Sequence, residues 1–235
     1  MNSKKLAKSV FLIITVFFTL SFSGENNSVC YKQNFKSKKA LSDFEFSQPG
    51  KWLLSKKEKG FALEFTGKSE GYQPPFRSPH TVGLIKGKKF KNFTLDVDLR
   101  QTGKEYGHRD MCIFFGFQDP AHFYYVHIAS ITDDHANNIF IVDGAPRTKI
   151  STKTNEGNDW GKSEDWNHTR VVRDVESGKI EIYFKDMENP IMTATNTKFG
   201  EGAIGFGSFD DSGMIDNIQI SGDGCIDSDN NFFPN

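Results

Sequence analysis

The chain has 235 residues, with 29 lysines and arginines against 30 aspartates and glutamates, which gives a formal net charge of −1 at pH 7. This balance leaves no basic excess to neutralise a phosphate backbone and argues against a nucleic-acid partner. A hydrophobic share of 37% with 21 glycines excludes a polytopic membrane protein and a collagen-like repeat. The 23 phenylalanines favour strands and bury large areas, so the composition indicates a β-rich core.

The first residues have the pattern of an export signal. Three lysines among the first eight residues precede an almost unbroken apolar run over residues 10–20, and the small residues Ser21 and Ser23 follow it. That run is too short to span a hydrocarbon core of about 30 Å. We therefore predict a signal peptide over residues 1–23, an exported protein that is periplasmic or secreted, and no membrane insertion after cleavage.

Apolar patterning predicts a series of short strands along the rest of the chain. Residues 93–100 alternate strictly between apolar and polar side chains, which turns the apolar set toward a core. Residues 111–117 and 123–129 are apolar on both faces, as expected for strands in a sheet that is covered on both sides. In chain order, the other predicted strands are residues 52–54, 61–65, 138–142, 148–152, 167–173, 179–184, 202–209 and 215–220.

Turn signals such as Asp143-Gly144 and Ser177-Gly178 separate these runs, and no segment sustains the 3.6-residue apolar period of a helix. The predicted fold class is all-β: a two-sheet antiparallel β-sandwich of jelly-roll type with few short helices. We expect a polar N-terminal segment over residues 24–44, one domain over residues 45–221 and a C-terminal tail over residues 222–235.

Two predicted hairpins carry a resemblance to a known superfamily. Residues 202–213 lead into residues 215–220, and residues 166–173 are followed by residues 178–183. Both hairpins resemble those of the concanavalin A-like jelly rolls. Over residues 45–221 the chain is most similar to exported domains of the 3-keto-disaccharide hydrolase type and their laminarinase-like relatives. The resemblance implies a carbohydrate-active domain whose partner is an oligosaccharide or polysaccharide.

The carboxylate motif of laminarinase-like enzymes is absent. Those glycosidases place their acid and nucleophile on one strand in a Glu-x-Asp-x-x-Glu spacing, with the carboxyl groups about 5 Å apart. Asp96 and Asp98 have an i, i+2 spacing, but no third acid follows them. We interpret these two residues as a solvated or groove-lining strand face, and retaining glycosidase chemistry is disfavoured.

The densest group of titratable residues favours proton transfer instead. Period-two alternation puts Tyr125 and His127 on one strand face, whereas the alternate positions carry core-like side chains. We therefore expect Tyr125 and His127 in a concave groove, with Arg109 near the start of the neighbouring strand. An arginine beside a sugar carboxylate makes the adjacent C–H more acidic, and a tyrosine and a histidine can then act as base and acid. These three residues are the predicted catalytic groups.

Other polar residues near this cluster predict the rest of a site for an anionic sugar. We expect substrate binding by His80, Arg100, Asp110, His135, Asn137, Arg147 and Lys149. For each residue alone the alternative is an ordinary structural role, such as a satisfied strand histidine or a local Arg109–Asp110 ion pair that ends a strand.

The resulting prediction is a carbon–oxygen lyase or dehydratase that acts on fragments of a uronate-containing polysaccharide, with sulfation left open. Two alternatives stay open: a hydrolase of the 3-keto-disaccharide type, and a non-catalytic carbohydrate-binding module. A module stacks sugars on exposed aromatic side chains, and the chain has only three tryptophans. That shortage favours an enzyme, which we expect to be a monomer.

The three cysteines have different predicted states. In an oxidising compartment Cys30 and Cys225, near the two ends of the chain, are predicted to form a disulfide, which leaves Cys112 as a buried thiol. Three unpaired cysteines are the alternative. No cysteine and histidine spacing fits structural zinc, so we expect no metal or other cofactor. A structural calcium ion at Asp133-Asp134 or Asp210-Asp211 is left open, although turn formation better explains these pairs.

Overall fold

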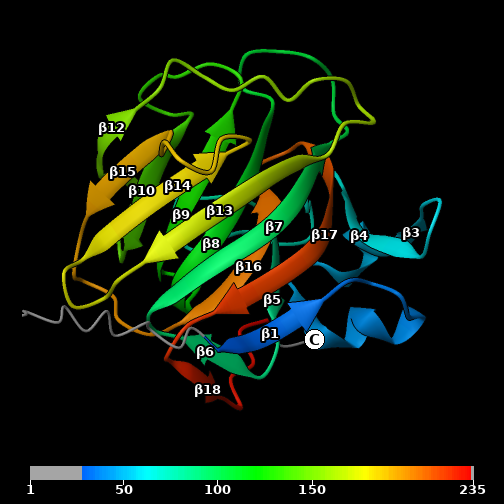
Figure 1. Cartoon of the computed structure of the whole chain (residues 1–235), viewed down its shortest axis with the longest axis horizontal. Helices are drawn as coiled ribbons and strands as arrows, with labels where there is room; N and C mark the ends of the chain where they lie inside the picture. The colour runs from blue at the N-terminus through cyan, green and yellow to red at the C-terminus, as the bar shows by residue number, and fades with distance from the viewer. Residues whose placement is uncertain (1–27, 234–235) are drawn as a thin grey trace, which may run out of the picture.

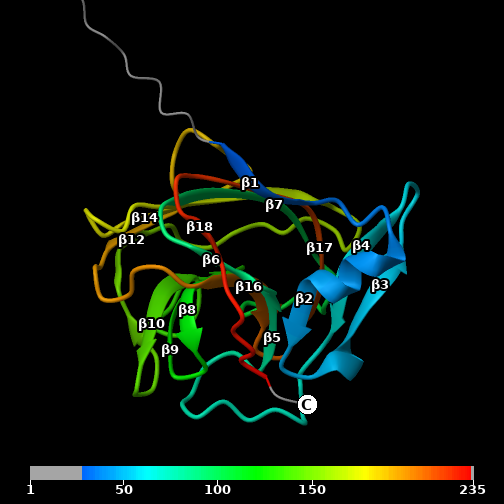
Figure 2. The ribbon, with the colours of Figure 1, turned by 90° about the horizontal axis from the view of Figure 1, so that it is seen from below.

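The computed structural model describes residues 28–233, so the predicted signal peptide over residues 1–23 lies outside the described residues. Two large antiparallel sheets pack face to face, and Figure 2 shows them edge-on as an upper and a lower layer. The two described helices are short 3-10 turns, η1 (Lys38–Asp43) and η2 (Pro49–Lys51). The all-β sandwich predicted from the sequence is therefore confirmed. Within residues 28–233 no helix is long and apolar enough to cross a membrane.

The larger sheet has nine strands, with β7 and β17 at its centre (Figure 1). The order along the sheet is β12-β15-β14-β13-β7-β17-β4-β3, and β1 also pairs with β17. In chain order its strands are β1 (Val29–Gln33), β3 (Trp52–Lys56), β4 (Phe61–Thr66), β7 (Phe93–Gln101), β12 (Ser151–Thr154), β13 (Asn167–Arg173), β14 (Lys179–Phe184), β15 (Met192–Thr195) and β17 (Ser212–Ser221).

The smaller sheet has seven strands in the order β11-β10-β9-β8-β16-β5-β2. Its members are β2 (Phe44–Phe46), β5 (Thr81–Ile85), β8 (Asp110–Asp119), β9 (His122–Ala129), β10 (Asn138–Asp143), β11 (Thr148–Lys149) and β16 (Ala203–Ser208). A separate pair joins β6 (Lys88–Phe90) to β18 (Cys225–Asp227).

The main core lies between the two large sheets and follows the predicted alternation. Phe93, Leu95, Val97 and Leu99 of β7 are all buried in it. On the opposite sheet β9 contributes Tyr124, Val126 and Ile128 to the same core. Because the side chains of a strand alternate between its two faces, the intervening β9 residues must point away from this core.

A second apolar cluster covers the outer face of the seven-stranded sheet. Phe114, Phe123, Tyr125 and Phe140 belong to it, and each is at most 2% exposed. Four phenylalanines from distant parts of the chain pack over it: Phe76, Phe209, Phe232 and Phe233. Figure 2 shows the C-terminal segment, in red, running down toward this layer. The covering explains why residues 111–117 and 123–129 are apolar on both faces.

The fold extends beyond the expected domain boundaries at residues 45 and 221. Strand β1 pairs with β17, and β18 pairs with β6, so both predicted flanking segments contribute strands. The disulfide expected between Cys30 and Cys225 is present, with Cα atoms 6.0 Å apart, and Cys112 is free and buried. This bond ties β1 to β18 and closes a loop of nearly the whole domain.

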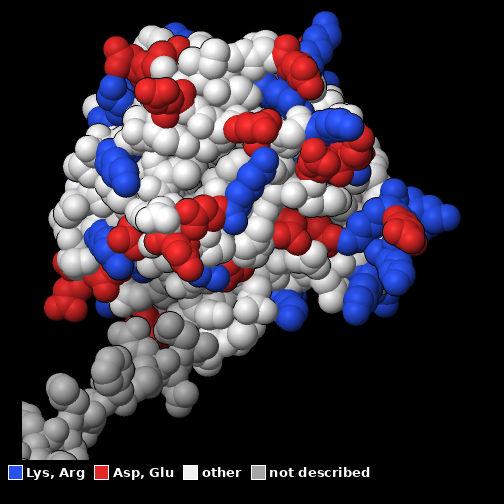
Figure 3. Space-filling view, turned by 45° about the horizontal axis from the view of Figure 1, so that its top comes forward, with Lys and Arg blue, Asp and Glu red and all other residues white. Residues whose placement is uncertain are grey.

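The outer face of the nine-stranded sheet is polar, as Asp96 and Asp98 suggested. His168 lies between them, with Nε2 3.0 Å from Asp96 and Nδ1 2.8 Å from Asp98. On the face shown in Figure 3, acidic and basic side chains are interspersed, in keeping with the near-zero net charge.

Candidate functional site

A buried histidine–carboxylate pair lies on the outer face of the seven-stranded sheet. His127 Nε2 is 2.9 Å from Asp110 Oδ2, and both side chains are at most 5% exposed. Antiparallel pairing of β8 with β9 sets Cys112 opposite His127, and Asp110 precedes Cys112 by two positions on the same face. Tyr125 and His127 thus face away from the main core, as their period-two spacing predicted.

Neighbouring donors hold the Asp110 carboxylate in its charged form. Ser208 Oγ donates to Asp110 Oδ1 at 2.7 Å, and Cys112 Sγ donates to Oδ2 at 3.2 Å. Burial raises the pKa of Asp110, but the charge and hydrogen bond of His127 outweigh it, so the pKa lies below its usual value. Burial, followed by the Asp110 carboxylate, raises the pKa of the Cys112 thiol well above its usual value, which keeps the thiol protonated.

The second ring nitrogen of His127 has no partner. Its Nδ1 atom is buried and makes no hydrogen bond to the described residues. A buried polar atom without a partner is costly, and such atoms concentrate at functional sites. Since Asp110 orients the ring through Nε2, the pair resembles the base and its orienting carboxylate in general acid–base catalysis.

An arginine is fixed beside this pair. Arg147 Nη1 donates to the Tyr125 hydroxyl at 2.9 Å. The guanidinium also lies between two aromatic rings, 4.8 Å from the centroid of Phe140 and 4.4 Å from that of Phe209. These contacts hold the planar group in one orientation, which suits recognition of a carboxylate or sulfate.

His127 and Arg147 line one pocket of about 260 Å³. Cations and imidazoles dominate its wall, with only Asp110 and Asp210 as acids; the full lining is Arg77, Tyr106, His108, Asp110, His127, His135, Arg147, Phe209 and Asp210. We call this the His127 pocket. Its size is slightly below the roughly 300–1,000 Å³ of typical small-molecule sites, which suits a single ring.

Two of the three predicted catalytic residues are placed differently from expectation. Arg109 is on the opposite strand face from Asp110: its Nε donates to Gln101 Oε1 at 2.6 Å and its Nη1 to the Gly161 carbonyl at 3.4 Å. It therefore joins the ends of the two sheets and does not line the His127 pocket. Tyr125 is fully buried beneath Arg147, and burial raises its pKa well above the usual value, so it is a support for Arg147 and lies outside the pocket wall.

The remaining predicted binding residues divide into two groups. Asp110, His135 and Arg147 line the His127 pocket, and His80 lies near it, with its ring 6.5 Å from that of Phe209. The other three are engaged elsewhere and do not line the pocket. Arg100 donates to the Ser163 carbonyl, Asn137 donates to Thr132 and Asn155, and Lys149 pairs with Asp134.

Asp211 is a site residue that the sequence analysis did not select. Its Oδ2 accepts hydrogen bonds from the Tyr106 hydroxyl and from the Asp110 backbone N–H, both at 2.9 Å. Burial and the neighbouring Asp110 charge raise the pKa of Asp211 to about 7. Because adjacent aspartates are typical of turns, the sequence did not indicate that Asp211 would contact Tyr106 and Asp110. Asp133 does form the expected turn, since its Oδ1 accepts from the His135 and Ala136 backbone N–H groups.

Two sets of side chains in this region have the donors for a metal ion. Asp110, Cys112 and His127 offer oxygen, sulfur and nitrogen ligands within 4.8 Å of one another, and Asp110, Asp210 and Asp211 offer three carboxylates. The first set suits a transition metal and the second a harder ion such as calcium. Strand pairing creates the first set, which is why sequence spacing did not predict it.

Comparisons with known proteins agree on the fold. No protein-family model and no curated protein matches the sequence. Among solved structures, carbohydrate binding module CBM66 from Bacillus subtilis is similar over 77% of this chain and 96% of its own, with 14% identity and a TM-score of 0.53. Lectin I-B4 from Griffonia simplicifolia is similar over 80% and 96%, with 12% identity and a TM-score of 0.50. The fold is a concanavalin A-like jelly roll.

Enzymes also contain this jelly roll. The xylan β-1,4-xylosidase from Bacillus halodurans is similar over 81% of the present chain but only 39% of its own, with 10% identity and a TM-score of 0.50. At these identities the similarity establishes the fold alone. Any chemistry must therefore be argued from the residues of the site.

Proposed function

We propose that this protein is an exported carbohydrate-active enzyme that eliminates across a C–O bond of an oligosaccharide bearing a uronate. The observation that carries the proposal is the buried Asp110–His127 pair, with Nδ1 of His127 unpartnered, beside the fixed guanidinium of Arg147. These groups supply a proton acceptor and a binding site for a carboxylate within one pocket.

The chemistry assigns a separate task to each side chain. Arg147 binds the uronate carboxylate and stabilises the enolate-like anion that forms when the neighbouring carbon loses its proton. In the proposed reaction a movement of the pocket wall exposes the buried Nδ1 atom of His127, which then takes that proton, and Asp110 stabilises the resulting imidazolium through Nε2. Tyr106 and His135 line the same pocket and are the candidate acids for protonating the leaving oxygen.

The comparisons support a saccharide as the ligand class, because a carbohydrate-binding module and a lectin share the architecture. The Cys30–Cys225 disulfide supports export, since such bonds persist in oxidising compartments. A pocket of about 260 Å³ favours recognition of one terminal sugar ring over a long segment of polymer.

Hydrolysis is the second candidate, and a specific pair of groups favours it. Asp211, with its pKa raised to about 7, is protonated at mildly acidic pH, whereas the lowered pKa of Asp110 keeps that carboxyl ionised. Carboxyls with separated pKa values are typical of glycosidases. These two, however, hydrogen-bond to each other, whereas a retaining enzyme holds its carboxyls about 5 Å apart on either side of the sugar. We therefore rank hydrolysis below elimination.

The test is incubation with a panel of uronate-containing oligosaccharides, in which the ultraviolet absorbance of an unsaturated product is followed. The wild-type protein should produce this absorbance, and His127→Ala should slow it by at least about 10²-fold. His168→Ala is the matched control, because His168 also contacts carboxylates, Asp96 and Asp98, but lies on the outer face of the other large sheet. It should turn over at the wild-type rate.

Three outcomes would contradict the proposal. Cleavage of a neutral glycan without an unsaturated product would favour hydrolysis. Saccharide binding without turnover across the panel would favour a binding module. Equal activity of His127→Ala and wild type would remove His127 from the reaction.

A further inference from the structure

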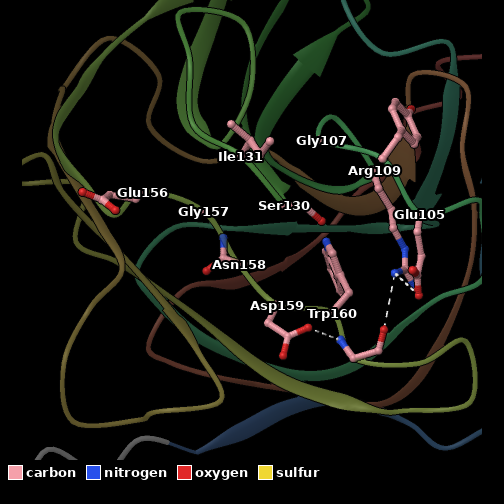
Figure 4. Close-up of a pocket in the computed structure, with 12 residues that line it drawn as sticks. Glu105, Gly107, Arg109, Ser130, Ile131, Glu156, Gly157, Asn158, Asp159 and Trp160 are labelled. Atoms are coloured by element: carbon pink, nitrogen blue, oxygen red, sulfur yellow. Dashed lines mark hydrogen bonds and ion pairs between the residues drawn. The ribbon is translucent and has the colours of Figure 1, made fainter.

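A second and larger hollow adjoins the His127 pocket. Its volume is about 620 Å³, and Tyr106 lines both cavities. Figure 4 shows Ile131, Trp160 and Arg109 around it, with Asn158 and Asp159 on the adjoining loop. We call it the Trp160 hollow. Because Tyr106 forms a wall of each cavity, the two cavities are neighbours.

The Trp160 hollow has an apolar shoulder that is unusually exposed for this protein. Tyr106 is 46% exposed and Ile131 is 54% exposed, and they are two of the five large apolar side chains in residues 28–233 that are at least 39% exposed. The Ile131 backbone N–H donates to the Gly107 carbonyl at 2.9 Å, which holds the two segments together. Sugars present an apolar face to such surfaces, and an aromatic ring is the usual partner.

Polar groups suited to sugar hydroxyls surround this shoulder. Trp160 is 1% exposed, and its Nε1 donor has no partner among the described residues. The exposed carboxylates of Glu105, Glu156 and Asp159 lie around the hollow, and they can accept charge-assisted hydrogen bonds from hydroxyl groups.

The charge of the Trp160 hollow is opposite to that of the His127 pocket. The one cation among its described lining residues, Arg109, is 4% exposed and already donates to Gln101 and to the Gly161 carbonyl. Its Nη1 also lies 3.9 Å from Glu105 Oε1, so Arg109 balances at most one of the three carboxylates. The three carboxylates on the wall therefore leave the hollow acidic. The His127 pocket instead contains Arg77 and Arg147 with three histidines against two aspartates.

We infer that the Trp160 hollow is a second sugar subsite, and that it takes a neutral unit next to the anionic unit in the His127 pocket. The inference rests on the proposed function for the identity of the first unit. It predicts a preference for saccharides in which a uronate is linked to a neutral sugar over chains made of uronates alone.

Electrostatics gives the reason for this preference. Like charges a few ångströms apart repel each other in water, and they repel more strongly at a partly desolvated surface. A uronate in the Trp160 hollow would be repelled by the carboxylates of Glu105, Glu156 and Asp159, because the one cation among the described lining residues, Arg109, is already paired. A neutral sugar would instead donate hydrogen bonds to the same carboxylates.

The experiment compares two tetrasaccharides of equal length, one alternating uronate with neutral sugar and one made only of uronates. Binding is measured by calorimetry at low salt on the His127→Ala protein, so that turnover does not interfere. We expect the alternating tetrasaccharide to bind more tightly by on the order of tenfold. The double variant Glu105→Gln/Glu156→Gln, made in the same background, should reduce this preference to about threefold or less.

A matched double variant controls for net charge. Glu58 and Glu201 are exposed and line neither the His127 pocket nor the Trp160 hollow, so Glu58→Gln/Glu201→Gln should keep the full preference. If the His127→Ala protein without further changes binds both tetrasaccharides equally, the inference is overturned while the proposed function stays intact. A preference that Glu105→Gln/Glu156→Gln does not change would also overturn it. Failure of both tetrasaccharides to bind would overturn the proposed function, and with it this inference.

Discussion

The two faces of the seven-stranded sheet differ in what they bury. The inner face, toward the other large sheet, carries Phe115, Tyr124 and Val126 within a continuous apolar core. The outer face carries a second apolar cluster, but at one end of it the same strands hold Asp110 and His127. Both faces are buried, and the outer one carries the buried Asp110–His127 pair.

This difference shows how a small sandwich can bury a histidine–carboxylate pair without disturbing its core. Burying a charged pair is costly unless it is hydrogen-bonded. On the outer face, Ser208 and Cys112 satisfy Asp110, and Arg147 with Phe209 covers the pair. Because strand residues alternate, each outer residue could change without altering its inner neighbours. The outer face should therefore govern activity and the inner face stability.

The largest expected effect is a difference in the free energy of unfolding between variants on the two faces of the seven-stranded sheet. Phe115→Ala on the inner face should lower the free energy of unfolding by about 4 kcal/mol, because it leaves a cavity in close-packed surroundings. His127→Ala should cost less, because Ser208 and Cys112 still donate hydrogen bonds to the buried Asp110 carboxylate. Chemical denaturation with urea measures both. A greater loss for His127→Ala would mean that the outer pair stabilises the fold more than the core does.

Two arginines give the next test. Arg109→Met should reduce the free energy of unfolding by about 2 kcal/mol, because Gln101 and the Gly161 carbonyl lose a buried donor. Its kcat/KM should fall much less than that of Arg147→Lys, because Arg109 lies outside the His127 pocket. Arg147→Lys should show the reverse, with a loss of on the order of 10² in kcat/KM, because a point charge lacks the fork that grips a carboxylate. If both variants lose activity equally, the split between the faces is wrong.

The raised pKa of Asp211 predicts that the free energy of unfolding depends on pH. Its folded-state pKa of about 7 lies above the usual value of 3.8, so the folded protein binds the proton more tightly than the unfolded chain. Stability contributed by the protonated group is fully present below about pH 4 and is lost as pH rises toward 7. Asp211→Asn should therefore gain stability relative to wild type by on the order of 2 kcal/mol between pH 4 and 8. Thermal unfolding across that range checks the sign, and a constant difference would contradict the raised pKa.

The smallest effect is expected at Lys149, although it was predicted to bind substrate. Lys149 lies on the edge strand β11, outside both cavities, and pairs with the exposed Asp134. Lys149→Ala should change the free energy of unfolding by less than about 0.5 kcal/mol, as for other exposed pairs. The kcat/KM should not change. A clear loss of kcat/KM would extend the His127 pocket toward β11.

The sequence by itself determined which side chains face which way. Alternation placed Phe93 and Leu95 in the core, and it turned Tyr125 and His127 to the opposite face. The same alternation, applied to Arg109, would have placed it with Met111 and apart from Asp110. The predicted sandwich followed from these local patterns, because period-two side-chain direction is a property of each strand alone.

Only the tertiary structure decided what covers the outer face and which groups meet there. Pairing of β8 with β9 put Cys112 and Asp110 beside His127. Long-range packing brought Arg147, which precedes β11, and Phe209, which follows β16, over the same pocket. These contacts join residues 15 to 62 positions apart. Short-range patterns specify a strand's faces, but the partners of those faces are selected by burial of the whole chain.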